Sequence, residues 1–234
     1  MIDMKSSTAL TNELDEQKRQ VKFITQHLEA AYGIPRNTRP DDPLDELILT
    51  ILSQSTSDTN SRRAFQHLKS RFADWEAVRR ARPATIAAAI KSGGLANVKS
   101  VVIKNVLNEI KLRRGELDLS FLRTISIAEA KAFLTSLKGI GPKTANCVLL
   151  FACGRPVFPM DTHIFRITRR LGLIPPSGSD EQAHKLMEQL VPANKHYSLH
   201  VNLIRHGRQI CRPQNPACQR CPLIEYCEYG LTQM

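Results

Sequence analysis

The stretch from Leu137 to His163 constrains the fold of this chain more than any other. It begins with LKGIGPKTAN, continues as an apolar run and ends with FPMDTH. Gly139 and Gly141 flank one aliphatic residue, so the backbone can turn sharply there without a Cβ penalty. Pro142 suits the first position of a helix, where a missing N–H costs nothing. The pattern predicts a helix-hairpin-helix, with helices over 127–137 and 144–153.

The hairpin turn is suited to contact a phosphate. Helix N-termini leave backbone N–H groups unpaired and carry partial positive charge. A Gly-x-Gly turn also lets the backbone approach nucleic acid closely without reading its sequence. An ordinary helix-turn-helix corner with a glycine stop explains the same residues. The candidate contacts to DNA are Gly139, Ile140 and Gly141.

Lys143 falls in the first turn of the second helix, and Asp161 follows it downstream. The helix carries the chain about 18 Å away, and residues 154–160 can reach back about 23 Å if extended. Asp161 can therefore return to the hairpin, where an N-cap position would hold its carboxylate. Lys143 can act there as an amine nucleophile, because the helix N-terminus, cations and desolvation disfavour its charged form. Alternatively, Lys143 only contacts phosphate and Asp161 only caps a helix.

Four of the six cysteines lie within 17 residues, in the pattern C-x6-C-x2-C-x5-C. In a protein that looks intracellular, such a cluster favours metal ligation over disulfides. Four thiolates suit zinc or an iron–sulfur cluster, and the ligand type does not separate them. The filled ligand set indicates a structural role. The candidate ligands are Cys211, Cys218, Cys221 and Cys227.

Charge is unevenly distributed along the 234 residues, whose net charge is +11. Residues 1–46 carry 6 Lys/Arg and 9 Asp/Glu, whereas the rest carries 27 and 13. This basic body indicates a polyanionic partner, with nucleic acid ahead of an acidic membrane. No apolar run approaches the roughly 20 residues that span a bilayer. We expect a cytoplasmic protein, associated with the nucleoid through DNA, and no membrane partner.

Apolar residues recur at helical spacing through most of the chain, and no segment alternates as a strand would. The sequence therefore predicts an all-α fold, with residues 1–12 disordered. Besides the hairpin helices, the predicted helices cover 14–32, 44–52, 59–72, 75–80, 84–91, 98–113, 162–171, 179–190 and 197–210.

These motifs together resemble the endonuclease III family of helix-hairpin-helix DNA glycosylases over roughly residues 20–229. LKGIGPKTAN resembles the family's hairpin, whose catalytic lysine falls on Lys143. The segment MDTH resembles the family's Val-Asp-Thr-His and places the catalytic aspartate on Asp161. The cysteine spacing resembles the family's [4Fe-4S] loop, here 211–227, so the resemblance implies this cluster rather than zinc.

The resemblance implies two helical lobes with a cleft between them that holds Lys143 and Asp161. One lobe is a six-helix barrel over 43–153 that ends in the hairpin. The other joins residues 13–42 to residues 154–234 and includes the cluster loop. We expect a monomer.

The implied activity is that of a bifunctional DNA glycosylase and AP lyase in base excision repair. Its partner is double-stranded DNA with damaged bases or abasic sites, from which it flips an oxidised pyrimidine. Lys143 would attack C1′ of the sugar and displace the base, and β-elimination would then nick the strand 3′ to the abasic site. Asp161 would stabilise the positive charge that develops on the sugar.

The family also inserts side chains into the base stack. Either Gln54 or Ser55 falls on the loop that fills the vacated place, and Leu95 falls on a second loop that wedges into the opposite strand. The alternative for Leu95 is a buried residue at the start of the next helix. His163 can line the base pocket, although a capped helix start explains it as well.

Two other functions compete with this interpretation. The first is a monofunctional glycosylase of the same superfamily, a class that typically lacks a lysine at position 143. The second is a non-catalytic DNA-binding protein stabilised by an iron–sulfur cluster.

Overall fold

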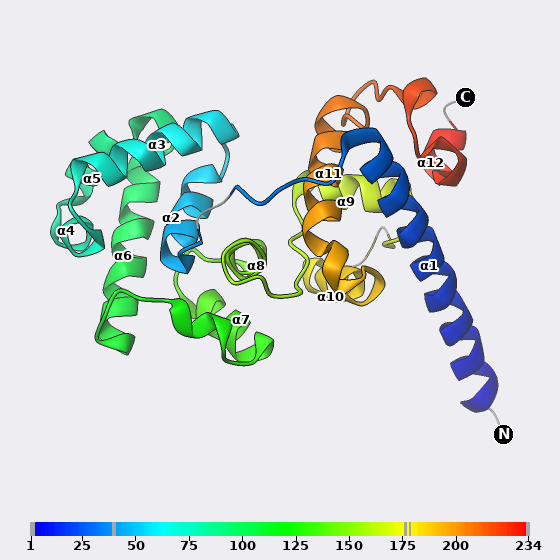
Figure 1. Cartoon of the computed structure of the whole chain (residues 1–234), viewed down its shortest axis with the longest axis horizontal. Helices are drawn as coiled ribbons and strands as arrows, with labels where there is room; N and C mark the ends of the chain where they lie inside the picture. Colours follow the sequence, from blue (N-terminus) through cyan, green and yellow to red (C-terminus); the bar gives the residue numbers. More distant parts are fainter. Residues whose placement is uncertain (1–2, 39–40, 176, 178, 233–234) are drawn as a thin grey trace. The chain divides into compact units, whose positions relative to one another are not determined.

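Helices are the only regular secondary structure in the residues that this computed structural model describes, 3–38, 41–175, 177 and 179–232 (Figure 1). The all-α prediction is therefore confirmed. Across the same residues, every helix is too short or too polar to span a bilayer. Many helices begin with an Asp or Ser side chain that accepts an N–H of the first turn, as N-cap residues do. These residues are Asp42, Ser57, Asp74, Ser126, Asp161 and Ser179.

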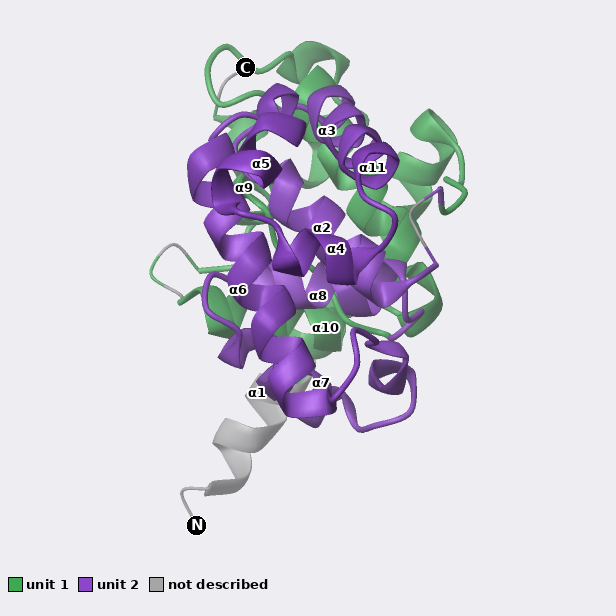
Figure 2. Cartoon of the chain, turned by 90° about the vertical axis from the view of Figure 1, so that its left-hand side faces the viewer, with its two compact units in different colours: residues 1–37, 156–234 green, residues 38–155 purple. Residues whose placement is uncertain are grey.

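The chain divides into two compact units (Figure 2), of which unit 2 covers residues 38–155. Its centre is α2, in which nine of eleven residues are buried. A helix that is buried on nearly every side serves as core, and α2 packs against α3, α6 and α8. The elements of unit 2 are α2 (Pro43–Ser53), α3 (Asp58–Arg71), α4 (Trp75–Arg80), α5 (Pro83–Ala89), η1 (Lys91–Gly93), α6 (Ala96–Arg114), η2 (Ser120–Arg123), α7 (Ile127–Ser136) and α8 (Pro142–Phe151).

Unit 1 joins residues 1–37 to residues 156–234. Its apolar core combines Val21, Ile24 and Leu28 of the first helix with residues of the C-terminal helices. Polar contacts also join the two ends of the chain, since Nδ2 of Asn202 donates to the oxygen of Gly33 at 2.9 Å. The elements of unit 1 are α1 (Asp3–Tyr32), α9 (Thr162–Arg170), α10 (Asp180–Leu190), η3 (Ala193–Lys195), α11 (His196–Gln209), η4 (Cys218–Arg220), η5 (Ile224–Tyr226) and α12 (Glu228–Leu231).

The structure gives the bounds of the first helix and of unit 2. Helix α1 begins at Asp3, so it includes most of segment 1–12; residues 1 and 2 lie outside the described residues. No glycine or proline interrupts the sequence before Gly33, which ends the helix with φ +77°. Unit 2 covers residues 38–155, and the expected barrel over 43–153 lies within it. Hydrogen bonds link both margins to η2: Arg123 donates to the backbone oxygen of Asp41, and Arg155 donates to the backbone oxygen of Arg123.

Candidate active site and iron–sulfur loop

The predicted helix-hairpin-helix is present in unit 2 as α7, a tight turn and α8. The amide of Ile140 donates to the oxygen of Leu137 at 3.0 Å and closes the turn. Gly139 has φ +92°, in the left-handed region that favours glycine. Gly141 is the extended N-cap of α8, and Pro142 is its first residue, as the sequence predicts.

The three turn residues differ in what they can offer to DNA. Gly139 and Gly141 are exposed, whereas Ile140 is only 4% exposed. Because the Ile140 amide is used within the turn, its side chain anchors the hairpin and its amide is not directed to a ligand. The exposed backbone of the two glycines is the part of the turn that a phosphate can approach.

Lys143 is half-buried in the first turn of α8, between exposed Pro142 and the buried face that begins at Thr144. At this end of the helix, amide groups without an intrahelical partner present partial positive charge. The amine therefore lies where an anion or an electron-rich group of a substrate is favoured.

Asp161 is half-buried and is the N-cap of α9. Its Oδ1 accepts the N–H of Ile164 at 2.8 Å, so the carboxylate has a fixed position. The capping expected from the sequence is confirmed. An ionised carboxylate has further acceptor sites, so Asp161 can also interact with a substrate.

Two histidines and a glutamate hold the segment just before Asp161, and sequence reasoning missed them. Nδ1 of His184 lies 3.0 Å from the oxygen of Phe158, and Nδ1 of His200 lies 3.0 Å from that of Pro159. Oε1 of Glu188 accepts the N–H of Phe158 at 3.2 Å. In the sequence, these residues stand out only as polar residues within the apolar faces of α10 and α11. That pattern does not indicate which backbone group each one contacts.

His163 is engaged by its own unit. Its Nδ1 lies 3.1 Å from Nη2 of Arg166. A Cβ placed on Gly207 would lie 2.9 Å from Nδ1 of His163. Arg166 also donates to the backbone oxygen of Cys211 at 2.8 Å. These contacts give His163 a packing role between α9 and α11, and its predicted place in a base pocket stays a prediction.

The candidate wedge residues are all exposed in unit 2. Gln54 and Ser55 follow α2, and Ser55 has φ +51°. Leu95 precedes α6 with φ +49° and is 59% exposed. The alternative that Leu95 is buried at the start of a helix is therefore wrong. A large exposed aliphatic side chain in a strained backbone is unusual and indicates a functional constraint.

The four cysteines near the C-terminus are free thiols that line one cavity. Four thiols around one cavity suit a group that four thiolates bind. The lining residues are Cys211, Cys218, Cys221 and Cys227, with Ile210, Pro216, Ile224, Tyr229 and Gly230.

Burial and nearby hydrogen-bond donors both act on the cysteine sulfurs. Burial, followed by the neighbouring thiols, raises the pKa of Cys221 to about 11, so its thiolate needs a cation to form. Nη1 of Arg170 donates to Sγ of Cys211 at 3.2 Å, and the Gly230 amide donates to Sγ of Cys227 at 3.3 Å. Donors of this kind stabilise metal-bound thiolates.

Comparison with known proteins assigns the class. Residues 48–193 match the HhH-GPD superfamily of base excision DNA repair proteins. The chain belongs to this superfamily. Residues 211–227, which begin and end with a cysteine of the cavity, match the iron–sulfur binding domain of endonuclease III. The resemblance to endonuclease III and the prediction of a [4Fe-4S] cofactor are both confirmed.

Individual relatives agree with this assignment. A candidate DNA glycosylase of Arabidopsis thaliana is 40% identical over 198 residues, covering 81% of this chain and 68% of the relative. Endonuclease III of Sulfolobus acidocaldarius is 35% identical over 187 residues, covering 79% and 81%. A solved non-covalent endonuclease III–DNA complex shares the fold with a TM-score of 0.79 at 24% identity, covering 93% of this chain and 98% of that one.

Proposed function

We propose that the chain is a bifunctional DNA glycosylase and AP lyase that removes oxidised pyrimidines from duplex DNA. The observation that carries this proposal is Lys143, a primary amine in the first turn of α8, directly after an exposed glycine turn. Such an amine can displace a base and then cleave the strand. The identity to proteins named endonuclease III supports the same assignment.

In the proposed reaction, unprotonated Nζ of Lys143 forms a bond to C1′ as the bond from C1′ to the base breaks. The base leaves with that electron pair and takes up a proton. Nζ then loses a proton and the ring oxygen O4′ gains one as the bond from C1′ to O4′ breaks, which gives a protonated Schiff base between Lys143 and C1′. A base or water takes a proton from C2′, and the electron pair of that C–H bond expels the 3′ oxygen with its phosphate, which nicks the strand by β-elimination.

Asp161 stabilises the positive charge that develops on the sugar, since a carboxylate fixed before the reaction needs no reorganisation. Its hydrogen bond from the Ile164 amide supplies that fixed position. The four cysteines would hold the [4Fe-4S] group as thiolates, and the bound group would cross-link a loop with little regular structure.

Binding to DNA requires that the flipped base be replaced in the stack. We assign Leu95 to one strand and either Gln54 or Ser55 to the other, because all three side chains are exposed on short loops. Flipping costs a few kcal/mol of unstacking, and inserted side chains offset part of it. The proposed active form is a cytoplasmic monomer.

Borohydride trapping on duplex DNA with an oxidised pyrimidine or an abasic site tests this function. Wild-type protein should form a covalent adduct on both substrates, and Lys143→Ala should form none. Lys138→Ala is the matched control, because Lys138 is an exposed lysine of the same hairpin and should leave the adduct intact. Base release without an adduct would identify a monofunctional glycosylase. DNA binding without base release would identify a non-catalytic protein.

A further inference from the structure

Lys99 is a lysine near the start of α6 that is only 2% exposed. Its Nζ donates to the backbone oxygen of Leu52 at 2.7 Å and to that of Gly93 at 2.8 Å. Leu52 lies in the last turn of α2, and Gly93 is the last residue of η1. Carbonyl groups at helix ends carry partial negative charge, which suits a cation. One ammonium group therefore joins the ends of two helices that are distant in the sequence.

Burial of this ammonium group has a cost, and desolvation lowers the pKa of Lys99 below its usual range. An aliphatic side chain would fill the space without that cost. What the lysine adds is the pair of hydrogen bonds. Helix α2 has no basic residue in its own last turn, so Lys99 supplies the charge that this end of α2 otherwise lacks.

Each anchored oxygen is followed by an exposed loop residue with a left-handed backbone. Ser55 comes three residues after Leu52 and has φ +51°, and Leu95 comes two residues after Gly93 and has φ +49°. Of the non-glycine residues that the structure describes, Asn215 alone shares a positive φ with these two. Such backbones persist only where their surroundings fix them. The two hydrogen bonds of Lys99 are placed to provide that fixation.

We propose that Lys99 is a positioning residue for base flipping: its two hydrogen bonds set the loop at 54–57 relative to the loop at 94–95. The inference rests on the proposed function, in which side chains of both loops enter the base stack. Two insertions into one duplex must keep a fixed spacing, and Lys99 joins the two elements, α2 and η1, that lead directly into these loops. Without its donors, each loop stays attached to its own helix but the spacing between them is no longer held.

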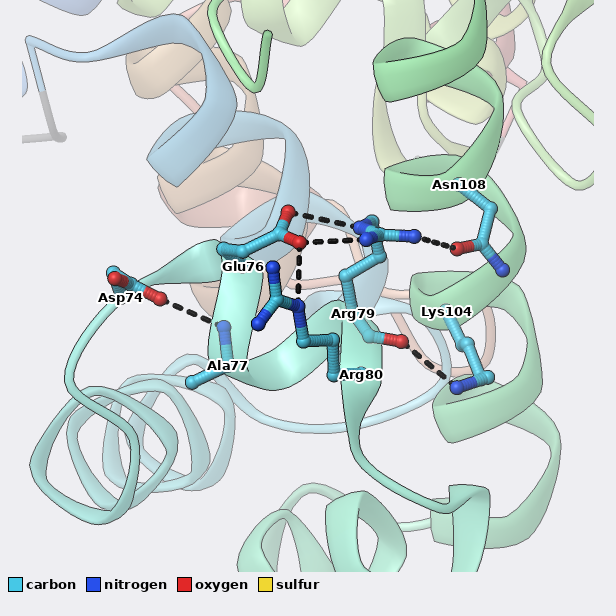
Figure 3. Close-up of polar contacts among 7 residues, drawn as sticks. All are labelled: Asp74, Glu76, Ala77, Arg79, Arg80, Lys104 and Asn108. Carbon is cyan, nitrogen blue, oxygen red and sulfur yellow. Dashed lines mark hydrogen bonds and ion pairs between the residues drawn. The ribbon is translucent and has the colours of Figure 1, made fainter.

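Lys99→Met tests this role, because methionine keeps an unbranched apolar side chain and removes both donors. Lys104→Met is the matched control. Lys104 lies on the same helix, and its Nζ donates to the oxygen of Arg79 at 2.8 Å (Figure 3). It also donates to the oxygen of Ala81 at 2.7 Å. Both substitutions remove two lysine–carbonyl bonds, but those of Lys104 anchor the end of α4. Where Lys99→Met does not fold, Lys99→Gln takes its place. Glutamine is shorter and uncharged, so it should weaken both hydrogen bonds and lower both readouts in the same direction, whereas wild-type readouts would overturn the inference.

Two readouts separate positioning from chemistry. The first is the single-turnover rate of base excision from a duplex. The second is the fluorescence of 2-aminopurine beside an abasic site, which reports unstacking and requires only DNA binding. We expect Lys99→Met to lower the excision rate about tenfold or more and to reduce the fluorescence change. Lys104→Met should leave both within about threefold of wild type.

A double-mutant cycle with Leu95→Ala identifies the loop as the intermediary. If Lys99 acts through the inserted side chain, Lys99→Met should cost less than about threefold in the Leu95→Ala background. Equal losses in both backgrounds, or equal effects of Lys99→Met and Lys104→Met, would overturn the inference. Failure of the wild type to release a base would overturn the proposed glycosylase instead, since the 2-aminopurine signal still reports the Lys99 effect.

Discussion

The side chain of Val102 fills the place where Gly139 would carry a Cβ, because an ideal Cβ there lies 2.9 Å from Cγ1 of Val102. Val102 lies on α6, three residues after Lys99. This contact joins the hairpin turn to the helix that follows the loop at 94–95. Both the positive φ of Gly139 and the close approach of Val102 exclude a side chain at this position.

Gly139→Ala should destabilise the protein by about 1 to 3 kcal/mol, because alanine is strained at φ +92° and its methyl group overlaps Val102. Urea unfolding measures the loss. Gly141→Ala is the control, since Gly141 has φ −94° and no atom lies within 4 Å of its ideal Cβ. It should leave stability within about 0.5 kcal/mol and weaken DNA binding, because a methyl group would keep the backbone from a phosphate. Equal destabilisation by both would contradict the prediction.

Asp161→Asn should separate the capping role of this side chain from its chemical role. Asparagine is as good an N-cap as aspartate, so the melting temperature should be nearly unchanged. Base excision should fall by roughly a hundredfold or more, because the amide cannot stabilise positive charge or accept a proton. Asp161→Ala should lose activity equally and also lose about 1 kcal/mol of stability. Full activity in Asp161→Asn would reduce Asp161 to a cap.

Cys153 should make the protein less stable at alkaline pH. Burial raises the pKa of this thiol to about 11, against an unfolded value of 9.0, although Arg123 and Arg155 oppose the shift. The folded state therefore keeps a proton that the unfolded state releases. The stabilisation is complete below pH 9 and is lost as the pH rises from 9 to 11, by about 2 to 3 kcal/mol.

Urea unfolding of wild type and Cys153→Ala at several pH values measures this effect. The difference in unfolding free energy between the two proteins should be constant near neutral pH and shift in favour of the variant above pH 9. Titrating groups shared by both proteins cancel in that difference. A difference that does not change up to pH 11 would show that the Cys153 thiol is not perturbed.

Features that depend on neighbouring residues in the chain could be predicted from the sequence. Pro142 at the first position of α8 and Asp161 as an N-cap follow from local backbone chemistry. The four cysteines are close in sequence, so their spacing alone brings them to one cavity. Their cofactor needed the resemblance to a family, because four thiolates suit more than one metal centre.

Features that depend on tertiary contacts could not be predicted in the same way. Lys99 is separated by 47 residues from Leu52, and nothing local marks either as a partner of the other. His200 meets Pro159 across 41 residues, and its position on an apolar helix face suggests only a core histidine. The exposure of Leu95 depends on how η1 packs, which the Gly93-Gly94 pair does not specify.

The division of the chain into two units sets the order in which the protein can fold during synthesis. Helix α1 is made before residues 38–155, yet its core partners in unit 1 come from residues 158–227. All of residues 38–155 are made in between, and these can form unit 2 around α2 without contacts to α1. Synthesis proceeds at about 5 to 20 residues per second. The core residues of α1 therefore remain without their partners for on the order of ten seconds or longer; they are Val21, Ile24 and Leu28. In the nascent chain, the apolar face of α1 therefore lacks its core partners until the C-terminal helices are made.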